Sequence, residues 1–509
     1  MNEKILIVGA GPVGLWLAAE LQLAGVKVRI VERAAERRLN SRAFTVQPRT
    51  LEVLAMRGRE QPFLDDGLPI LSSHFGALTS RLDFRSLDTR FPFVLMHPQS
   101  ETERKLENIA LELGTRIDRN HTVTAVSQDP DGVDVDVVGP RGAEKIRSEY
   151  VVGCDGASSF VRRAIGVEFR GTDSSVYGFL GDVTVDDPPP PGFNVNSTGG
   201  MLMIIPKPGD SVRIVGIDAT QQQGNSKLEY SEFRESVIRL AGTDFGMRDP
   251  VWLSRYGDAS RQVASYRSGR VLLAGDAAHV HFPAGGVGLN VGVQDAMNLG
   301  WKLAAQVQGR APEGLLDSYH AERWPVGDAL LQSTKAQVAL IYATTPSAQA
   351  LRGLFNELVA LNSQVSLELA RRSSALDVAY PPASKDSHAI TGKRAPDLQL
   401  TGIDGQSTSL YRLLHGGQPL LMHLRGSEAP RSGLDVIDSV RVWSGRVVET
   451  GQPDWAGLRA VLVRPDGHVA WAAEQPAETN AGILSGVIRV SERNSLRCDL
   501  PLSHDPPRD

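Results

Sequence analysis

The feature that most constrains this chain is a glycine-rich segment close to its N-terminus. The segment comprises Gly9, Ala10, Gly11, Pro12, Val13 and Gly14. An apolar run precedes it at residues 5–8, a helix-patterned stretch follows at 15–24, and a second apolar strand over 26–32 ends in Glu32. Glycines let the backbone approach a pyrophosphate at a positive helix N-terminus, while a carboxylate that closes the next strand accepts hydrogen bonds from a ribose diol. The order strand, turn, helix, strand and acid therefore predicts a dinucleotide-binding unit.

Length and charge restrict the function classes that remain. A chain of 509 residues is too long for a single core, so several domains are expected. The 54 basic and 59 acidic residues leave a net charge of -5, which gives no reason to expect nucleic acid or an anionic membrane as a partner. Two cysteines, Cys154 and Cys498, are too few for a disulfide framework or a structural metal site, as is usual in a reducing cytoplasm.

Changes in periodicity predict how the chain is organised. We expect an α/β part at 1–175, an antiparallel sheet at 176–265 with strands near 179–185, 200–206 and 212–218, a second α/β part with long helices at 266–372, and a small α/β domain at 395–509. The helices are predicted at 315–343 and 347–372. Between them and the last domain, residues 373–394 are rich in Ser, Pro, Asp and Lys, a composition typical of a linker with few contacts.

Two further predicted strands end in motifs that carry chemistry. Cys154 is followed by Asp155, a glycine and Ser159, and Gly275 is followed by Asp276. Beyond Asp276 lies a glycine loop with Pro283, Gly285, Gly286, Gly288, Leu289 and Asn290. Each motif alone is common in ordinary turns, and Asp276 alone could simply cap a helix.

Taken together, the three glycine-containing motifs resemble the class A flavoprotein monooxygenases, which are built like para-hydroxybenzoate hydroxylase. The resemblance is closest to the aromatic polyketide hydroxylases through segments 41–43, 48–52, 87–92 and 97–99. Segments 394–396 and 463–467 resemble the thioredoxin-like domain of that branch. The resemblance implies an α/β fold in which a Rossmann-type FAD-binding domain carries an inserted antiparallel-sheet substrate domain and a C-terminal thioredoxin-like α/β domain.

Carried over by position, the resemblance implies an FAD site. Its residues would be Gly9, Gly11, Pro12, Val13, Gly14, Glu32, Arg33, Arg42, Gln99, Asp155, Asp276, Pro283, Gly288, Leu289 and Asn290. Among these, Glu32 would hold the adenosine ribose, Asp276 a ribityl hydroxyl, and the amides of Gly288, Leu289 and Asn290 the flavin pyrimidine. Pro283, Gly285 and Gly286 would line the flavin face. No catalytic side chain is assigned, because the flavin carries the chemistry.

Candidate substrate residues come from the alternation in the middle sheet. They are Met201, Met203, Ile205, Arg213 and Val215. The same alternation is typical of any half-buried strand, so both interpretations stay open. His279 and His281 likewise fit either a proton-transfer role or a structural one, and buried Cys154 is expected to be a small hydrophobe rather than a nucleophile.

The resemblance implies a monooxygenase that takes electrons from NADPH or NADH and hydroxylates a polyphenolic, polyketide-type substrate with dioxygen through a flavin C4a-hydroperoxide. Antibiotic or other secondary-metabolite biosynthesis would be its setting, and a homodimer is compatible with it. Baeyer-Villiger oxygen insertion and a non-catalytic FAD-binding partner remain as alternatives. A flavin-dependent halogenase is excluded by its own signature, because no two tryptophans lie two positions apart.

Overall fold

The computed structural model describes residues 3–474 except 38–39, 42, 208, 223, 225, 383, 425–433, 438 and 449–451. Two residues singled out from the sequence, Arg42 and Cys498, lie outside the described residues. Within the described part, no helix combines the length and apolarity that a membrane crossing requires.

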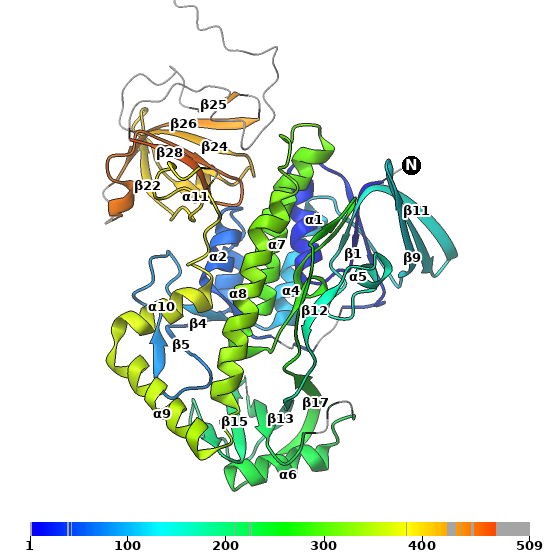
Figure 1. Ribbon diagram of the computed structural model, residues 1–509, viewed down its shortest axis with the longest axis vertical. Helices are drawn as coiled ribbons and strands as arrows, with labels where there is room; N and C mark the ends of the chain where they lie inside the picture. Colours follow the sequence, from blue (N-terminus) through cyan, green and yellow to red (C-terminus); the bar gives the residue numbers. More distant parts are fainter. Residues whose placement is uncertain are drawn as a thin grey trace, which may run out of the picture.

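A mixed eight-stranded sheet with a parallel centre forms the first layer of the molecule (Figure 1). The parallel strands run in the order β20 (Val271–Leu273), β11 (Gly142–Gly153), β1 (Glu3–Val8), β2 (Val28–Glu32) and β8 (Arg116–Arg119). Antiparallel additions are β19 (Arg267–Ser268), β9 (Thr122–Asp129) and β10 (Gly132–Gly139). Helix α1 (Pro12–Leu23) contacts both α4 (Gln99–Glu112) and α7 (Gly288–Val307). The predicted Rossmann-type α/β fold is confirmed.

The register of this sheet brings four strand ends to one edge. Val8 pairs with Val31 on one side and with Gly153 on the other, and Gly153 pairs with Leu273. Because parallel strands point the same way, the segments that follow them meet at the carboxyl edge, where open α/β sheets bind their ligands. The glycine-rich turn, Glu32 and the two motifs at 154–159 and 275–276 all follow these strands.

A second, antiparallel sheet lies at the far end of the molecule from the C-terminal strands (Figure 1). Its strands run in the order β14 (Asn194–Ser197), β15 (Gly200–Pro206), β16 (Ser211–Asp218), β13 (Tyr177–Thr184) and β17 (Arg248–Gly257). Helix α6 (Tyr230–Ala241) covers one face, where Leu202, Ile204 and Phe233 share an apolar cluster. The predicted antiparallel sheet is therefore present.

Three consecutive helices follow α7 in the chain: α8 (Ser318–Ile341), α9 (Pro346–Leu361) and α10 (Ser363–Ser374). The expectation of one helix over 347–372 is wrong, because Asn362 interrupts it. Asn362 has a non-helical backbone (φ -119°, ψ 102°), and its side chain accepts hydrogen bonds from the amides of Gln364 and Val365. A residue that caps a new helix cannot continue the old one.

The C-terminal sheet is also mixed, with one parallel pair of strands and otherwise antiparallel pairs. Its strands run in the order β23 (Ser407–Ser409), β22 (Gln399–Gly402), β26 (Val440–Val447), β24 (Leu420–Leu424), β27 (Ala460–Val463) and β28 (Val469–Ala473), with β25 (Leu434–Ile437) paired to β26. Shorter elements are α2 (Pro48–Ala55), α3 (Gln61–Asp66), α5 (Phe160–Ala164), α11 (Leu410–Leu413), β3 (Thr45–Val46), β4 (Leu68–Ile70), β5 (Ser72–His74), β6 (Arg81–Asp83), β7 (Val94–Met96), β12 (Phe169–Thr172), β18 (Ser260–Val263) and β21 (His279–Val280).

Residues 373–394 make many contacts, contrary to the expectation for a linker. Tyr380 is buried, and its hydroxyl accepts a hydrogen bond of 3.2 Å from Arg323 of α8. The amide of Gly392 donates to the carbonyl of Val469 in β28 at 2.8 Å. Polar residue composition missed these contacts because backbone groups and one tyrosine make them. The domain boundaries at 175, 265, 372 and 394 stay a prediction.

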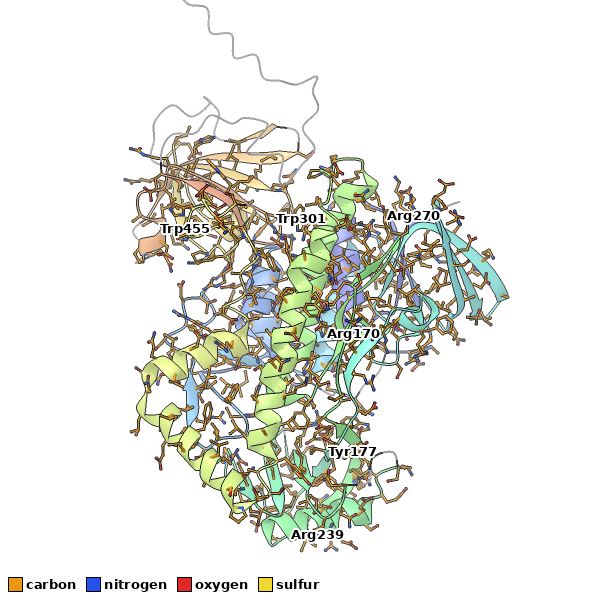
Figure 2. All side chains as sticks on the ribbon, in the orientation of Figure 1. Arg170, Tyr177, Arg239, Arg270, Trp301 and Trp455 are labelled. Atoms are coloured by element: carbon orange, nitrogen blue, oxygen red, sulfur yellow. The ribbon has the colours of Figure 1, made fainter. Side chains whose placement is uncertain are left out.

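Buried charges join the C-terminal sheet to the first layer. Glu322 of α8 accepts hydrogen bonds of 2.7 Å from Lys302 of α7 and from Arg464, which follows β27. Arg464 also pairs with Asp466, whose carboxylate accepts from Trp301. Figure 2 shows Trp301 on α7, on the side that faces the C-terminal strands. Although burial alone would raise it, the charges of Arg464 and Lys302 lower the pKa of Glu322 to about 2.

We expect Glu322→Gln to weaken the fold in a pH-dependent way. Because the folded-state pKa lies below the ordinary 4.5, the stabilisation from ionised Glu322 is complete above pH 4.5 and is lost as the pH falls to about 2. The variant should lose up to about 3 kcal/mol near neutral pH and nothing near pH 2. Urea unfolding across this range measures the difference.

The control for this experiment is Glu368→Gln, which removes an exposed partner of Arg372. Exposed pairs contribute little, so this variant should match the wild type at every pH. A Glu322→Gln penalty that does not change with pH would contradict the assignment.

Candidate functional site

The three glycines of the N-terminal turn lie in three different environments. Gly9 has φ +110°, and a Cβ there would lie 2.4 Å from the carbonyl oxygen of Cys154. A Cβ on Gly14 would lie 2.1 Å from the carbonyl oxygen of Gly9, whereas one on Gly11 would have no protein atom within 4 Å. Helix α1 begins at Pro12 without a side-chain cap. The turn thus leaves open space in front of an uncapped helix N-terminus, which is the arrangement that binds phosphate.

Glu32 ties this turn to the end of β2. One carboxylate oxygen accepts from the amide of Ala10 and the other from the amide of Ala34, both at 2.8 Å. Since each carboxylate oxygen has two lone pairs, both oxygens keep a free acceptor position for a ligand hydroxyl. The neighbouring Arg33 is exposed to solvent.

Asp276 lies at the carboxyl edge of the sheet, shortly after β20. It lies in the short 3-10 turn Gly275–Ala277, is exposed, and accepts no hydrogen bond from the residues that the structure describes. Its Oδ1 would lie 4.0 Å from a Cβ on Gly288, and a Cβ on Gly275 would lie 2.8 Å from the side chain of Val13. The glycine-rich turn, Asp276 and the start of α7 are therefore close neighbours.

The glycine loop before α7 is held by Asn290. Its Oδ1 accepts from the amide of Gln47 at 2.8 Å, and its Nδ2 donates to the carbonyls of Thr45 and Gly286 at 3.1 and 3.0 Å. Gly286 has φ +64°. Helix α7 begins at Gly288 without a side-chain cap, so its first amides are available to a ligand. Leu289 is half-buried, and Pro283 on the loop is exposed.

His279 is part of a buried structural network. Its Nε2 lies 2.9 Å from Oδ2 of Asp295, the same oxygen that accepts from the amide of Gly275 at 3.1 Å. Arg323 donates to Oδ1 of Asp295 at 2.7 Å. Burial opposes ionisation, but Arg323 and His279 together lower the pKa of Asp295. This network fixes the turn that presents Asp276.

His281 differs from His279, because it lies against the start of α7. Its Nδ1 is 2.7 Å from the carbonyl oxygen of Phe282, which can only accept, so Nδ1 carries the proton and Nε2 has the lone pair. A Cβ on Gly288 would lie 3.0 Å from that Nε2. Burial lowers the pKa of His281, although the negative charge of Asp276 opposes this shift.

Two predicted cofactor residues have partners within the protein. Gln99 accepts from the amide of Ala43 at 3.1 Å and donates to Glu103 at 2.7 Å. Asp155 accepts from the hydroxyl of Ser159 and from the amide of Phe160 at 2.6 Å, so it caps the N-terminus of α5. Burial raises the pKa of the neighbouring Cys154 thiol, as expected for a small hydrophobe.

The five predicted substrate residues share one face of the antiparallel sheet. Met203 pairs with Val215 and Ile205 with Arg213, and residues opposite each other point to the same side. Met201 and Met203 pack in a cluster with Phe282 and Ala284 of the glycine loop. This face of the sheet therefore meets the loop that precedes α7.

The side chain of Arg213 makes its contacts within the protein. It is buried and donates two hydrogen bonds, of 2.7 and 2.8 Å, to Asp182 of β13. Its guanidinium carbon also lies 4.2 Å from the centre of the Phe44 ring. These contacts fix the position of the Arg213 side chain within the sheet.

Comparison with known proteins relates these features to a family. Residues 2–334 match the FAD binding domain model, and residues 388–489 match the aromatic-ring hydroxylase C-terminal model. An uncharacterized aromatic compound monooxygenase of Bacillus subtilis (strain 168) is 43% identical over 94% of this chain and 95% of its own length. The solved anhydrotetracycline hydroxylase from Streptomyces rimosus is 40% identical, covers 96% of this chain and 98% of its own, and has a TM-score of 0.87.

The chain belongs to the FAD-dependent aromatic-ring hydroxylases. The predicted family is thereby confirmed, and this hydroxylase is an FAD-dependent monooxygenase by family membership. A dialkyldecalin synthase of Streptomyces rugosporus is also similar, with 38% identity over 93% of this chain and 97% of its own.

The residues present in this hydroxylase fit an FAD molecule. Two helix N-termini lack side-chain caps, a space opens beside Gly11, and the exposed carboxylate of Asp276 lies close to the start of α7. The sequence did not reveal the parts played by Gln47, Asp295 and Arg323, which support the site without facing it. The hydrogen-bonding partners of these residues are distant in sequence, so no local sequence pattern predicts these contacts.

Two alanine substitutions in the N-terminal turn should separate binding from folding. Gly11→Ala places a methyl group in the open space, so we expect a normal fold and a rise of at least about 10-fold in the Kd for FAD. Gly14→Ala forces a methyl group against the Gly9 carbonyl and should destabilise the protein itself. Circular dichroism and FAD titration of the apoprotein measure the two effects.

The matched control is Gly405→Ser, a turn glycine with open surroundings between β22 and β23 of the C-terminal sheet. It should leave FAD affinity unchanged, although its positive φ costs some stability. Unaltered FAD affinity in Gly11→Ala would contradict this site.

Proposed function

We propose that FAD lies along the carboxyl edge of the parallel sheet. The uncapped α1 faces the pyrophosphate, Glu32 the adenosine ribose, and Asp276 a ribityl hydroxyl. The amides of Gly288, Leu289 and Asn290 face the flavin pyrimidine, where the positive end of α7 favours the anionic reduced form. The convergence of Val13, Asp276 and Gly288 supports this assignment.

The proposed reaction is hydroxylation of a polyphenolic, polyketide-type substrate, with NADPH or NADH as electron donor. Bound FAD would supply the activation of dioxygen. The observation that carries the proposal is the apolar sheet face with Met201 and Met203, which meets Phe282 and Ala284 directly before α7. An aromatic substrate on that face would lie next to the flavin and away from water.

The protein's own part in such a reaction is binding and orientation. A phenolic substrate activates its own ring when its hydroxyl ionises, so no protein nucleophile is needed. His281 uses Nδ1 for the carbonyl of Phe282, so its Nε2 can accept a proton at the start of α7. We propose that it receives the phenolic proton, whereas His279 stays structural.

A second candidate is a protein that binds FAD without oxygenating its substrate. The likeness to a dialkyldecalin synthase favours it, because that name denotes no oxygen transfer. Both candidates share the same cofactor site, so only turnover separates them.

The test is NADPH and NADH oxidation by the FAD-loaded protein with and without a panel of multi-ring polyphenols, followed by product analysis under labelled dioxygen. Hydroxylation predicts substrate-stimulated oxidation and one labelled oxygen in a product with intact rings. A ring-expanded lactone would indicate Baeyer-Villiger insertion instead. Conversion of a substrate without donor consumption would support the non-oxygenating candidate and contradict the proposed reaction.

A further inference from the structure

A cavity of about 450 Å³ lies at the edge of the antiparallel sheet, between β14 and α9. It is lined by Thr79, Asn194, Val195, Asn196, Gln349, Arg352, Gly353 and Asn356, most of which have polar side chains. A cavity of this size accommodates a small organic ligand or part of a larger one. None of these residues belongs to the FAD site described above.

Arg352 is the main charge in the cavity wall. Its side chain is only 7% exposed, and it donates to the carbonyl oxygens of Gly76, Leu340 and Ala77. Three of its five N–H donors are thereby used, and in the described chain no carboxylate pairs with it. A buried arginine without a carboxylate partner is costly, and an acidic ligand would relieve that cost.

Asn194 and Asn356 add hydrogen-bonding capacity to the same cavity. Nδ2 of Asn194 donates to Ala77 at 2.9 Å, whereas its buried Oδ1 has no partner among the described residues. Oδ1 of Asn356 accepts from the hydroxyl of Thr79 and from the amide of Ser80. The cavity wall thus combines an arginine that has no carboxylate partner in the described chain with the amide side chains of Asn194 and Asn356, a set suited to an ionised or enolised oxygen group.

The cavity and the substrate face lie on the same side of the sheet. Asn194 of β14 is directly opposite Met203 of β15, so both side chains point to that side. The carbonyl of Ala77 binds Arg352 and Asn194, while its side chain belongs to the cluster with Met201, Phe282 and Ala284. Ala77 therefore contacts both the wall of the polar cavity and the apolar cluster. From β14 to β16 the sheet spans about 10 Å, which is longer than a single aromatic ring.

We propose that this cavity is the polar end of the substrate site and that Arg352 determines specificity there. It binds a carboxylate, phenolate or vinylogous acid at one end of a multi-ring substrate whose other end lies on the Met203 face. The assignment rests on the proposed function for the existence of such a substrate. A single-ring phenol is too short to occupy both regions.

The test uses Asn356→Asp, which keeps both acceptor contacts of Asn356 and adds a negative charge to the cavity. Its control is Asn362→Asp, which adds the same charge at the α10 cap outside the cavity and likewise keeps its acceptor contacts. The probes are a dihydroxyanthraquinone carboxylate and the matching carboxamide. Their Kd values are measured on the FAD-loaded protein from the change in flavin absorption, without donor.

We expect Asn356→Asp to raise the Kd of the carboxylate by about 10-fold while that of the carboxamide changes less than about 2-fold. Asn362→Asp should leave both values unchanged, and FAD affinity should be the same in all three proteins. Arg352→Lys, which keeps the charge, should retain the preference for the carboxylate, and Arg352→Met should lose it.

The proposal would be overturned if Asn356→Asp changed the Kd of both probes equally. It would also be overturned if the wild type bound both probes equally well or bound neither of them. The same outcome follows if Asn356→Asp raises the KM for NADPH but not for NADH, because the acidic group would then be a phosphate of the donor. Because binding is measured without turnover, a carboxylate preference in a protein that oxidises no donor would refute the hydroxylase function and leave the subsite intact.

Discussion

The parallel register of the first sheet is the constraint on which the rest of the molecule depends. Val8, Gly153 and Leu273 lie in one row across β1, β11 and β20. A shift of one residue in this register would point the side chains of a strand to the opposite face of the sheet. It would also move the motif that follows the strand away from its neighbours. The apolar side chains that hold this register are the core itself: Ile5, Leu6, Ile7, Val151, Val152, Val271 and Leu272 are all fully buried.

Polar contacts then fix the segments that leave this edge. Asp295 holds the turn at Gly275 from behind, and Asn290 holds the glycine loop to β3. Arg323 links Asp295 to Tyr380, and its neighbour Glu322 links α8 to Arg464 of the C-terminal part. The C-terminal sheet is thus connected through adjacent residues of α8 to the turn that carries Asp276. The C-terminal domain, whose sequence has no pair of cysteines, therefore has a structural role through this connection.

Local sequence predicted those parts of the site that depend on backbone chemistry. The glycine-rich turn, the acid at the end of β2 and the glycine loop were all recognisable, because each requires particular residue types in a fixed order. The alternation in the middle sheet also predicted the shared face of Met203 and Val215. Long-range partners could not be predicted in this way. Arg213 is paired with Asp182, which lies on a different strand, and the capping role of Asp155 depends on where α5 begins.

The central claim, that aligned strand ends assemble one FAD site, is tested most directly by a crystal structure of the protein with FAD bound. The account predicts the pyrophosphate beside Gly11, a ribityl hydroxyl within hydrogen-bond distance of the Asp276 carboxylate, and the pyrimidine ring at the first amides of α7. A flavin bound away from α7, with Asp276 still facing solvent, would contradict it.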